Sequence, residues 1–173
     1  MKLAQILSLV ATASLGVTAG VACDVEDQDV MERGKHEEKA CTLTQGYWKT
    51  HNRHAKQPKK AVDWPDNDYF DEDTTFMDND LGFPGCPEHG TYLEVLHTPP
   101  AGSAYYILAH QYIAAKLNLF NGAGDPDAWQ AVTDAWVILR DCEVSSDEFS
   151  EAIDLSETLD DYNNGYWGPG HCD

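Results

Sequence analysis

The chain has 173 residues and carries 30 Asp and Glu residues against 11 Lys and Arg residues, a formal net charge of −19. A length of this order favours a single folded domain. The charge argues against nucleic acid as a partner, because nucleic-acid binding depends on basic groups that release counterions. It also argues against adhesion to an anionic bilayer through charge alone.

The segment 1–22 has the pattern of an export signal, with Lys2 followed by an apolar stretch and then by small residues. Ser, Thr and Gly dilute the apolar stretch, which argues against a stable membrane span. Residues 20–23 (GVAC) resemble the lipobox at which bacterial lipoproteins are processed, although Gly20 stands where Leu is usual in such signals. We therefore predict a lipid on Cys23, with ordinary cleavage after Ala19 or Ala22 as the alternative.

The cysteine count agrees with lipidation. Five cysteines is an odd number, whereas exported chains usually pair theirs. If Cys23 carries lipid, four cysteines remain for two disulfides: Cys41, Cys86, Cys142 and Cys172. Three connectivities stay open, and the alternative for Cys23 is a free or crosslinking thiol. Bridges at Cys41 and Cys172 would tie down both ends of the folded part, each contributing about 2–4 kcal/mol.

Residues 24–39 are mostly charged and have almost nothing apolar to bury, so we interpret residues 23–40 as a disordered tether and residues 41–173 as a helical domain. The first expected helix is Thr44–Ala55, with Thr44 as its N-cap. Basic residues between 49 and 60 are then followed by dense acids between 63 and 80, in a stretch broken by Pro, Asn and Gly. That composition predicts a long irregular acidic loop, pinned to the domain by Trp64, Phe70 and Phe76.

The longest uninterrupted helical pattern is Ser103–Phe120. Apolar residues cover more than half of its circumference, which is typical of a helix buried among others. His110, Gln111 and Asn118 belong to its narrow polar strip. Lys116 breaks the apolar arc.

Other helices carry clear start signals. Thr91 and Glu94 form a capping box for a helix that ends at His97. Asp125 is the expected N-cap of the next helix, with Pro126 at its first position.

The Asp125 helix has an apolar stripe in which Trp129 and Trp136 are expected to pack on the central helix. A second capping box, Ser145 to Glu148, opens a last helix that should bury Phe149, and Tyr166 and Trp167 should hold the tail against the domain. No β alternation is long enough for a sheet. The predicted fold is a small all-α domain, stapled by disulfides, around the central helix at about 103–120.

Three segments in this order resemble a module of secreted and surface-attached bacterial proteins, the TQGYWK(N/T)H module: Cys41–His51, Leu93–Pro100 and Leu108–Asn118. The resemblance covers about residues 41–139. It implies export and a shared helical body, but it implies no chemistry, because no activity is established for the module. This chain departs from the pattern at Asn52, where Pro is common, and in an acidic insertion around Asp66–Asp80.

The acidic loop is the strongest candidate for a metal site, because carboxylate oxygens are the ligands that Ca²⁺ prefers. The candidate ligands are Asp66, Asp68, Asp71, Asp73, Asp78 and Asp80. An EF-hand pattern fails in every register, and a dense acidic run is usually a solvated surface or a partner for basic residues. Ca²⁺ is therefore an alternative, and the preferred expectation is that the chain has no cofactor.

Four residues are expected to serve the structure: Trp48, His51, His110 and Lys116. Lys116 should reach water or pair with a carboxylate, and the competing hypothesis is an amine of lowered pKa that acts as nucleophile or base. His51 should hydrogen-bond its short helix to the central helix. The histidine spacing lacks a zinc motif.

The sequence has no nucleophile elbow, phosphate loop or dinucleotide fingerprint. We therefore predict a non-enzymatic, exported cell-envelope lipoprotein, in the periplasm or at the cell surface, with a secreted soluble protein as the alternative. It is expected to contact an unidentified protein or glycan, to meet the membrane only through its N-terminal lipid, and to bind no nucleic acid. Two other functions stay open: a Ca²⁺-binding surface module that uses the loop at 66–80, and an exported hydrolase that uses His51 or His110 with a carboxylate.

Overall fold

The computed structural model describes residues 40–55, 64–65, 70–79 and 83–172. The predicted signal peptide, Cys23 and the tether up to residue 39 lie outside the described residues. Within them, no helix is long and apolar enough to cross a membrane. The elements are α1 (Gln45–Thr50), β1 (Asp78–Asn79), β2 (Phe83–Pro84), the 3-10 helix η2 (Pro87–His89), α2 (Tyr92–His97), α3 (Ala104–Phe120), α4 (Pro126–Leu139) and α5 (Phe149–Asn163).

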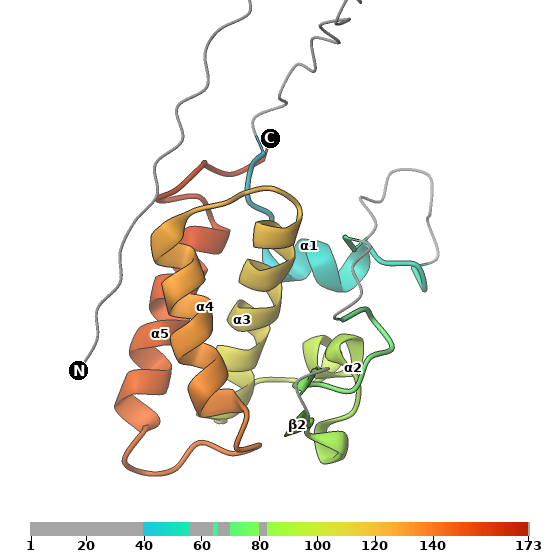
Figure 1. The fold of residues 1–173 in the computed structure, drawn as a ribbon, viewed down its shortest axis with the longest axis vertical. Coiled ribbons are helices and arrows are strands. Elements are labelled where there is room, and N and C mark those ends of the chain that lie inside the picture. The colour runs from blue at the N-terminus through green and yellow to red at the C-terminus, as the bar shows by residue number, and fades with distance from the viewer. Residues whose placement is uncertain (1–39, 56–63, 66–69, 80–82, 173) are drawn as a thin grey trace, which may run out of the picture. The chain divides into compact units, whose positions relative to one another are not determined.

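The all-α prediction is confirmed, since β1 and β2 form only a two-residue antiparallel pair. Helix α3 is the centre of the domain (Figure 1). Helices α4 and α5 pack on α3 and on each other, and α1 and α2 also pack on α3 and on each other. Leu108, Ile113 and Leu117 on α3 are fully buried. A helix enclosed over most of its circumference is what its apolar pattern predicted.

The predicted helix starts are largely confirmed. The Ser103 side chain accepts a hydrogen bond from the Tyr106 N–H at the start of α3, and Asp125 caps α4 in the same manner. Thr91 and Glu94 form the expected capping box of α2. Beyond the end of α3, Gly122 adopts φ +92°, a left-handed conformation that suits glycine.

Two helix boundaries differ from the prediction. Helix α1 ends at Thr50 and does not reach Ala55, because the Asn52 amide donates to the Lys49 carbonyl and accepts from the His54 N–H. Such local side-chain bonds compete with helix continuation. Helix α5 starts at Phe149: the Glu148 carboxylate accepts from Ser145 in a turn that precedes the helix, so Ser145 is not its N-cap.

Three aromatic residues that were expected to pack against the domain are exposed instead. Trp129 is 44% exposed, Phe149 55% and Tyr166 77%, and Trp136 is only partly buried. The face that α4 buries is formed by Ala128, Ala131, Val132, Ala135, Ile138 and Leu139. Alanines at this contact let helices approach closely, and the two tryptophans are left at the edge of the stripe. Trp64, Phe70 and Phe76 are buried as predicted.

Two disulfides close the domain, and their pairing is Cys41–Cys172 and Cys86–Cys142. Next to the first bridge, the Thr42 N–H donates to the Gly170 carbonyl at 2.8 Å and the Cys172 N–H donates to the Thr42 carbonyl at 3.0 Å. The two ends of the described domain therefore lie together. Disulfides form and persist in oxidising compartments, so they indicate an extracytoplasmic location.

Candidate functional site

The polar strip of α3 is buried and is used to connect helices. Asn118 Oδ1 accepts hydrogen bonds from the Leu43 N–H at 2.9 Å and from Trp48 Nε1 at 3.1 Å. Its Nδ2 donates to the Leu43 carbonyl and to Asn163 Oδ1, both at 2.9 Å. Asn163 in turn donates to Gln111 on α3. All four hydrogen-bonding positions of the Asn118 amide are thereby occupied, which a buried polar group requires.

His110 connects α3 to two other helices. Its Nε2 donates to the Val95 carbonyl of α2 at 2.8 Å, and its Nδ1 lies 3.0 Å from the Gln45 side chain of α1. Burial lowers the pKa of His110, because desolvation disfavours the imidazolium. His110 therefore joins α1 to the central helix, the contact that the sequence analysis expected from His51.

His51 does not reach the central helix. Its ring stacks on Tyr47 with centroids 4.0 Å apart, and its Nδ1 lies 3.0 Å from the Tyr47 carbonyl. The prediction that His51 joins α1 to α3 is therefore wrong. Its contacts are local because it is the C-cap of a six-residue helix, where the ring folds back over the preceding turn. Trp48, by contrast, is fully buried and bonds to Asn118.

The ammonium of Lys116 lies in a box of aromatic rings. Its Nζ is 4.2 Å from the ring centroid of Phe70, 5.1 Å from that of Tyr92 and 5.6 Å from that of Tyr112. It also donates to the Tyr92 hydroxyl at 3.3 Å. No carboxylate of the described residues forms an ion pair with it. The predicted carboxylate partner is thus replaced, within the described chain, by three aromatic faces.

Burial lowers the pKa of Lys116 to about 8, because removal from water disfavours the ammonium. Burial also raises the pKa of Tyr92 and of Tyr112, which keeps both hydroxyls protonated beside it. Lys116 is the described residue that comes closest to a reactive group. Its immediate surroundings are rings and the hydroxyl of Tyr92, which burial keeps protonated, and no carboxylate of the described residues forms an ion pair with it.

The described part of the acidic loop encloses Arg53. Its guanidinium contacts Asp71 at 2.9 Å, Glu72 at 3.2 Å and Asp73 at 2.8 Å, and His54 Nε2 lies 2.9 Å from Asp73. Burial raises the pKa of Asp71, but the hydrogen bonds from Arg53 and Thr74 outweigh it, and the net shift is downward. These carboxylates are therefore already paired with Arg53 and His54.

The remaining predicted ligands are scattered or undescribed. Asp78 lies in β1 and forms no ion pair with Arg53 or His54, and Asp66, Asp68 and Asp80 lie outside the described residues. Among described residues, a metal-like grouping occurs only at Cys86, Glu88 and Cys142. Both of those sulfurs are in a disulfide, so they are not thiolate ligands. Ca²⁺ binding by the loop therefore stays a prediction.

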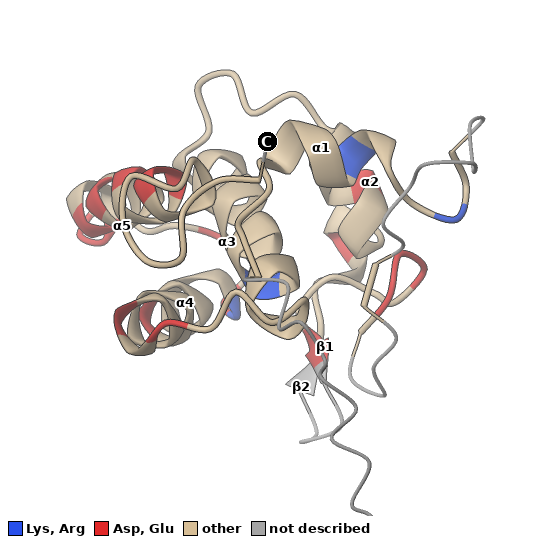
Figure 2. Cartoon of the chain, turned by 90° about the horizontal axis from the view of Figure 1, so that it is seen from above, with Lys and Arg blue, Asp and Glu red and all other residues tan. Residues whose placement is uncertain are grey.

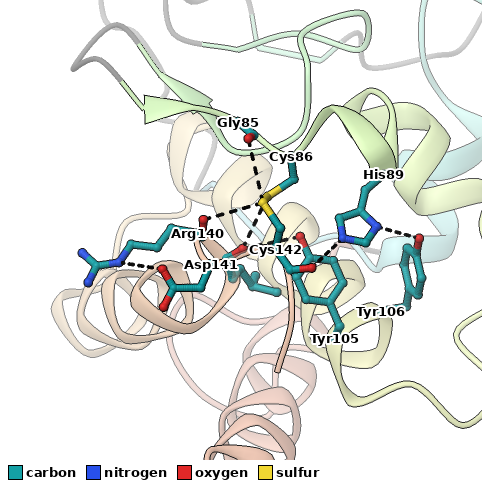
Figure 3. The surroundings of a disulfide bond; sticks show 9 residues. Gly85, Cys86, His89, Tyr105, Tyr106, Arg140, Asp141 and Cys142 are labelled. Carbon is teal, nitrogen blue, oxygen red and sulfur yellow. Dashed lines mark hydrogen bonds and ion pairs between the residues drawn. A yellow bond between two sulfur atoms is a disulfide. The ribbon is translucent and has the colours of Figure 1, made fainter. Parts of the chain in front are cut away.

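His89 lies beside the Cys86–Cys142 bridge (Figure 3). Its Nε2 donates to the Cys142 carbonyl at 2.7 Å, its Nδ1 lies 2.9 Å from the Tyr106 hydroxyl, and its ring stacks on Tyr105. Cys142 itself adopts φ +63°, an uncommon conformation for a residue with a side chain. The sequence analysis did not identify this role of His89, because its partners are far away along the chain.

Two open depressions border the polar strip of α3. The first has a volume of about 520 Å³ and lies between α3 and α5, with Ile107 and Ile153 among its lining residues. The second has a volume of about 430 Å³, and Lys49 and His110 are among its lining residues. Asp160 borders both. In the second depression a histidine and a carboxylate share one concave surface, the arrangement that a hydrolase would need, but both ring nitrogens of His110 already contact protein groups.

No protein-family model, curated protein or solved structure matches this chain. The resemblance to the TQGYWK(N/T)H module thus stays an expectation from the sequence. The arguments that follow depend on the chemistry of the described residues.

Proposed function

We propose that this protein is a non-enzymatic cell-envelope lipoprotein. A lipid on Cys23 anchors the chain, residues 24–39 act as a tether, and the helical domain is displayed for contact with a protein or a glycan. The lipobox-like residues 20–23 and the odd cysteine count support the anchor. The two disulfides support a domain that works outside the cytoplasm.

One observation carries the non-enzymatic part of the proposal. The described side chains best suited to chemistry are engaged within the domain: His110 with α1 and α2, His89 with Tyr106 and Cys142, and Lys116 with its aromatic box. A general base or nucleophile must be within reach of a substrate. These groups instead hold helices together, which suits a rigid module that presents its surface.

The anchor is tested by expressing the full chain in a bacterial host that processes lipoproteins and by measuring the mass of its N-terminal peptide. We expect a diacylglyceryl mass on Cys23 and recovery with membranes. The variant Cys23→Ser should lose the lipid and appear in the soluble fraction. As a control, the double variant Cys41→Ser/Cys172→Ser also replaces cysteines, those of a disulfide, but should keep the lipid.

An unmodified peptide that begins at Gly20 or Cys23 would overturn the anchor and favour ordinary cleavage and secretion. The partner is sought separately, by crosslinking and affinity capture from intact envelopes that carry the full-length chain. Identification of one protein or glycan, lost from the capture when the domain is unfolded by reduction, would define the contact. Hydrolysis of a captured glycan or peptide by the pure protein would contradict the non-enzymatic proposal.

A further inference from the structure

The depression between α3 and α5 combines an apolar floor with an acidic rim. Ile107 of α3 and Ile153 of α5 are partly exposed in it. Glu157, Asp160 and Asp161 of α5 form its rim. We call this depression the α3–α5 groove. It is open to solvent and has a volume of about 520 Å³, which is room for a few side chains of an elongated ligand.

Among the described residues, no cation forms an ion pair with the acidic rim. Helix α5 contains no Lys or Arg, and after Arg140 the sequence has ten Asp and Glu residues and no Lys or Arg at all. The described ion pairs involve Arg53, His54 and Arg140, and none involves a carboxylate of α5. Figure 2 shows acidic residues along α5. Like charges on one helix repel each other, so a cationic partner would relieve a cost that the domain alone does not offset.

One carboxylate of the rim, that of Asp160, is held in place. Asp160 Oδ1 accepts a hydrogen bond from Gln111 Nε2 at 2.8 Å, and Gln111 is itself fixed by Asn163. This network links the rim to the buried amides around Asn118, so the carboxylate lies on a rigid part of the fold. A fixed carboxylate loses little entropy when it binds a cation, which favours recognition.

From the groove and its charge we propose that the α3–α5 groove docks a basic segment of another protein, one that carries aliphatic side chains between its Lys or Arg residues. The aliphatic side chains would lie on Ile107 and Ile153, and the cations would meet Glu157 and Asp161. An anionic ligand is disfavoured by the rim, and an uncharged one would leave the carboxylates unpaired. This inference deepens the proposed function, because it names a class of protein partner for the displayed domain.

The test uses the full-length exported chain and a short fluorescent peptide of alternating Lys and Leu residues, followed by anisotropy. An all-Lys peptide of equal charge is compared with it. We expect the Lys/Leu peptide to bind more tightly by about five-fold or more, because only its leucines can use the apolar floor. Binding should weaken as salt rises, since the rim is exposed.

Helix α5 provides a closely matched control. Glu157→Gln/Asp161→Asn neutralises two carboxylates that line the groove, and Glu151→Gln/Asp154→Asn neutralises two on the same helix that do not line it. Both double variants change the net charge equally. We expect the first to weaken the Lys/Leu peptide about ten-fold, since two exposed ion pairs are lost, and the second by less than about two-fold. Melting curves check that both variants fold.

Equal weakening by the two double variants would overturn the proposal and assign the attraction to net charge alone. Equal affinity for the two peptides, or no binding of the Lys/Leu peptide, would also overturn it. If Ca²⁺ or spermidine binds with the same variant pattern and the peptide does not, the groove is a small-cation site and the proposal is wrong. None of these results bears on the lipid anchor, which the mass of the N-terminal peptide tests independently.

Discussion

The side-chain amide of Asn118 pairs with the backbone of Leu43 through two hydrogen bonds, each 2.9 Å long: Asn118 Oδ1 accepts from the Leu43 N–H, and Asn118 Nδ2 donates to the Leu43 carbonyl. The Asn118 amide thus satisfies both the N–H and the carbonyl of Leu43, as the backbone of a neighbouring β-strand would. Because the same Oδ1 accepts from Trp48 Nε1, one residue of α3 orients both the segment that enters the domain and the helix that follows. A buried amide with every position used is costly to replace by an apolar side chain.

We expect Asn118→Leu to lower the free energy of unfolding by about 3–5 kcal/mol, because it leaves the Leu43 N–H, the Leu43 carbonyl and Trp48 Nε1 without their partner. Urea denaturation followed by tryptophan fluorescence measures it. Gln130→Ala, an exposed change on α4, is the control and should stay within about 0.5 kcal/mol of the parent. A small loss for Asn118→Leu would mean that water replaces the amide.

Lys116 predicts an unusual dependence of stability on pH. Its pKa is about 8 in the folded protein and 10.5 without burial. Between these values the folded protein has released the proton while the unfolded chain keeps it, so unfolding takes up a proton and the free energy of unfolding rises with pH. This contribution is absent below pH 8 and complete above pH 10.5, and it amounts to at most about 3 kcal/mol.

Lys116→Met isolates this contribution, because Met keeps a long chain but does not titrate. The difference in unfolding free energy between parent and variant should grow in favour of the parent from about pH 8 to pH 10. At pH 7 we expect the two proteins to agree within about 1 kcal/mol, since the variant loses both the contacts with the rings and the cost of a buried charge. Urea melts across this pH range provide the test, and parallel pH profiles would contradict it.

The two disulfides should differ in their effect on stability. Cys41–Cys172 spans 131 residues and Cys86–Cys142 spans 56. In the chain-entropy account a longer closed loop restricts the unfolded chain more, so Cys41→Ala/Cys172→Ala should cost about 4–5 kcal/mol and Cys86→Ala/Cys142→Ala somewhat less. Urea denaturation of both double variants decides this. A larger loss for the second pair would indicate that the fully buried Cys86 contributes through packing.

The tryptophans of α1 and α4 should also differ. Trp48 is fully buried and hydrogen-bonded, whereas Trp129 is 44% exposed and touches Phe120 edge-on. We expect Trp48→Ala to cost about 3–5 kcal/mol and Trp129→Ala about 1 kcal/mol. Thermal and urea unfolding give both values. A loss of 3 kcal/mol or more at Trp129 would show that it packs as the sequence had predicted.

The helices could be predicted because their signals are local. Each helix signal depends on residues within a few positions of one another. Examples are the apolar residues around the circumference of α3, the capping box at Thr91 and the start of α4 at Asp125 and Pro126. Helix α4 shows the limit of such reasoning. Periodicity identified its apolar stripe, but it could not tell that the alanines of the stripe are buried while Trp129 is 44% exposed.

The polar contacts could not be predicted, because they join residues that are distant in sequence. Lys116 meets Phe70 from the acidic loop and Tyr92 from α2, and a wheel of α3 alone contains neither. Asn163 at the end of α5 likewise bonds to Asn118 and Gln111, both more than forty residues away along the chain. The groove likewise depends on Ile107 and Ile153 coming together from two helices.

The bridge between Cys41 and Cys172 has a mechanical consequence. If the protein is held by its N-terminal side and pulled from its C-terminal end, the tension passes from Cys41 to Cys172 through one covalent bond and the Thr42 backbone contacts beside it. The helices between these residues then carry almost no load. Tension applied at these two ends therefore bypasses the helical domain, which keeps its shape while the disulfide is intact.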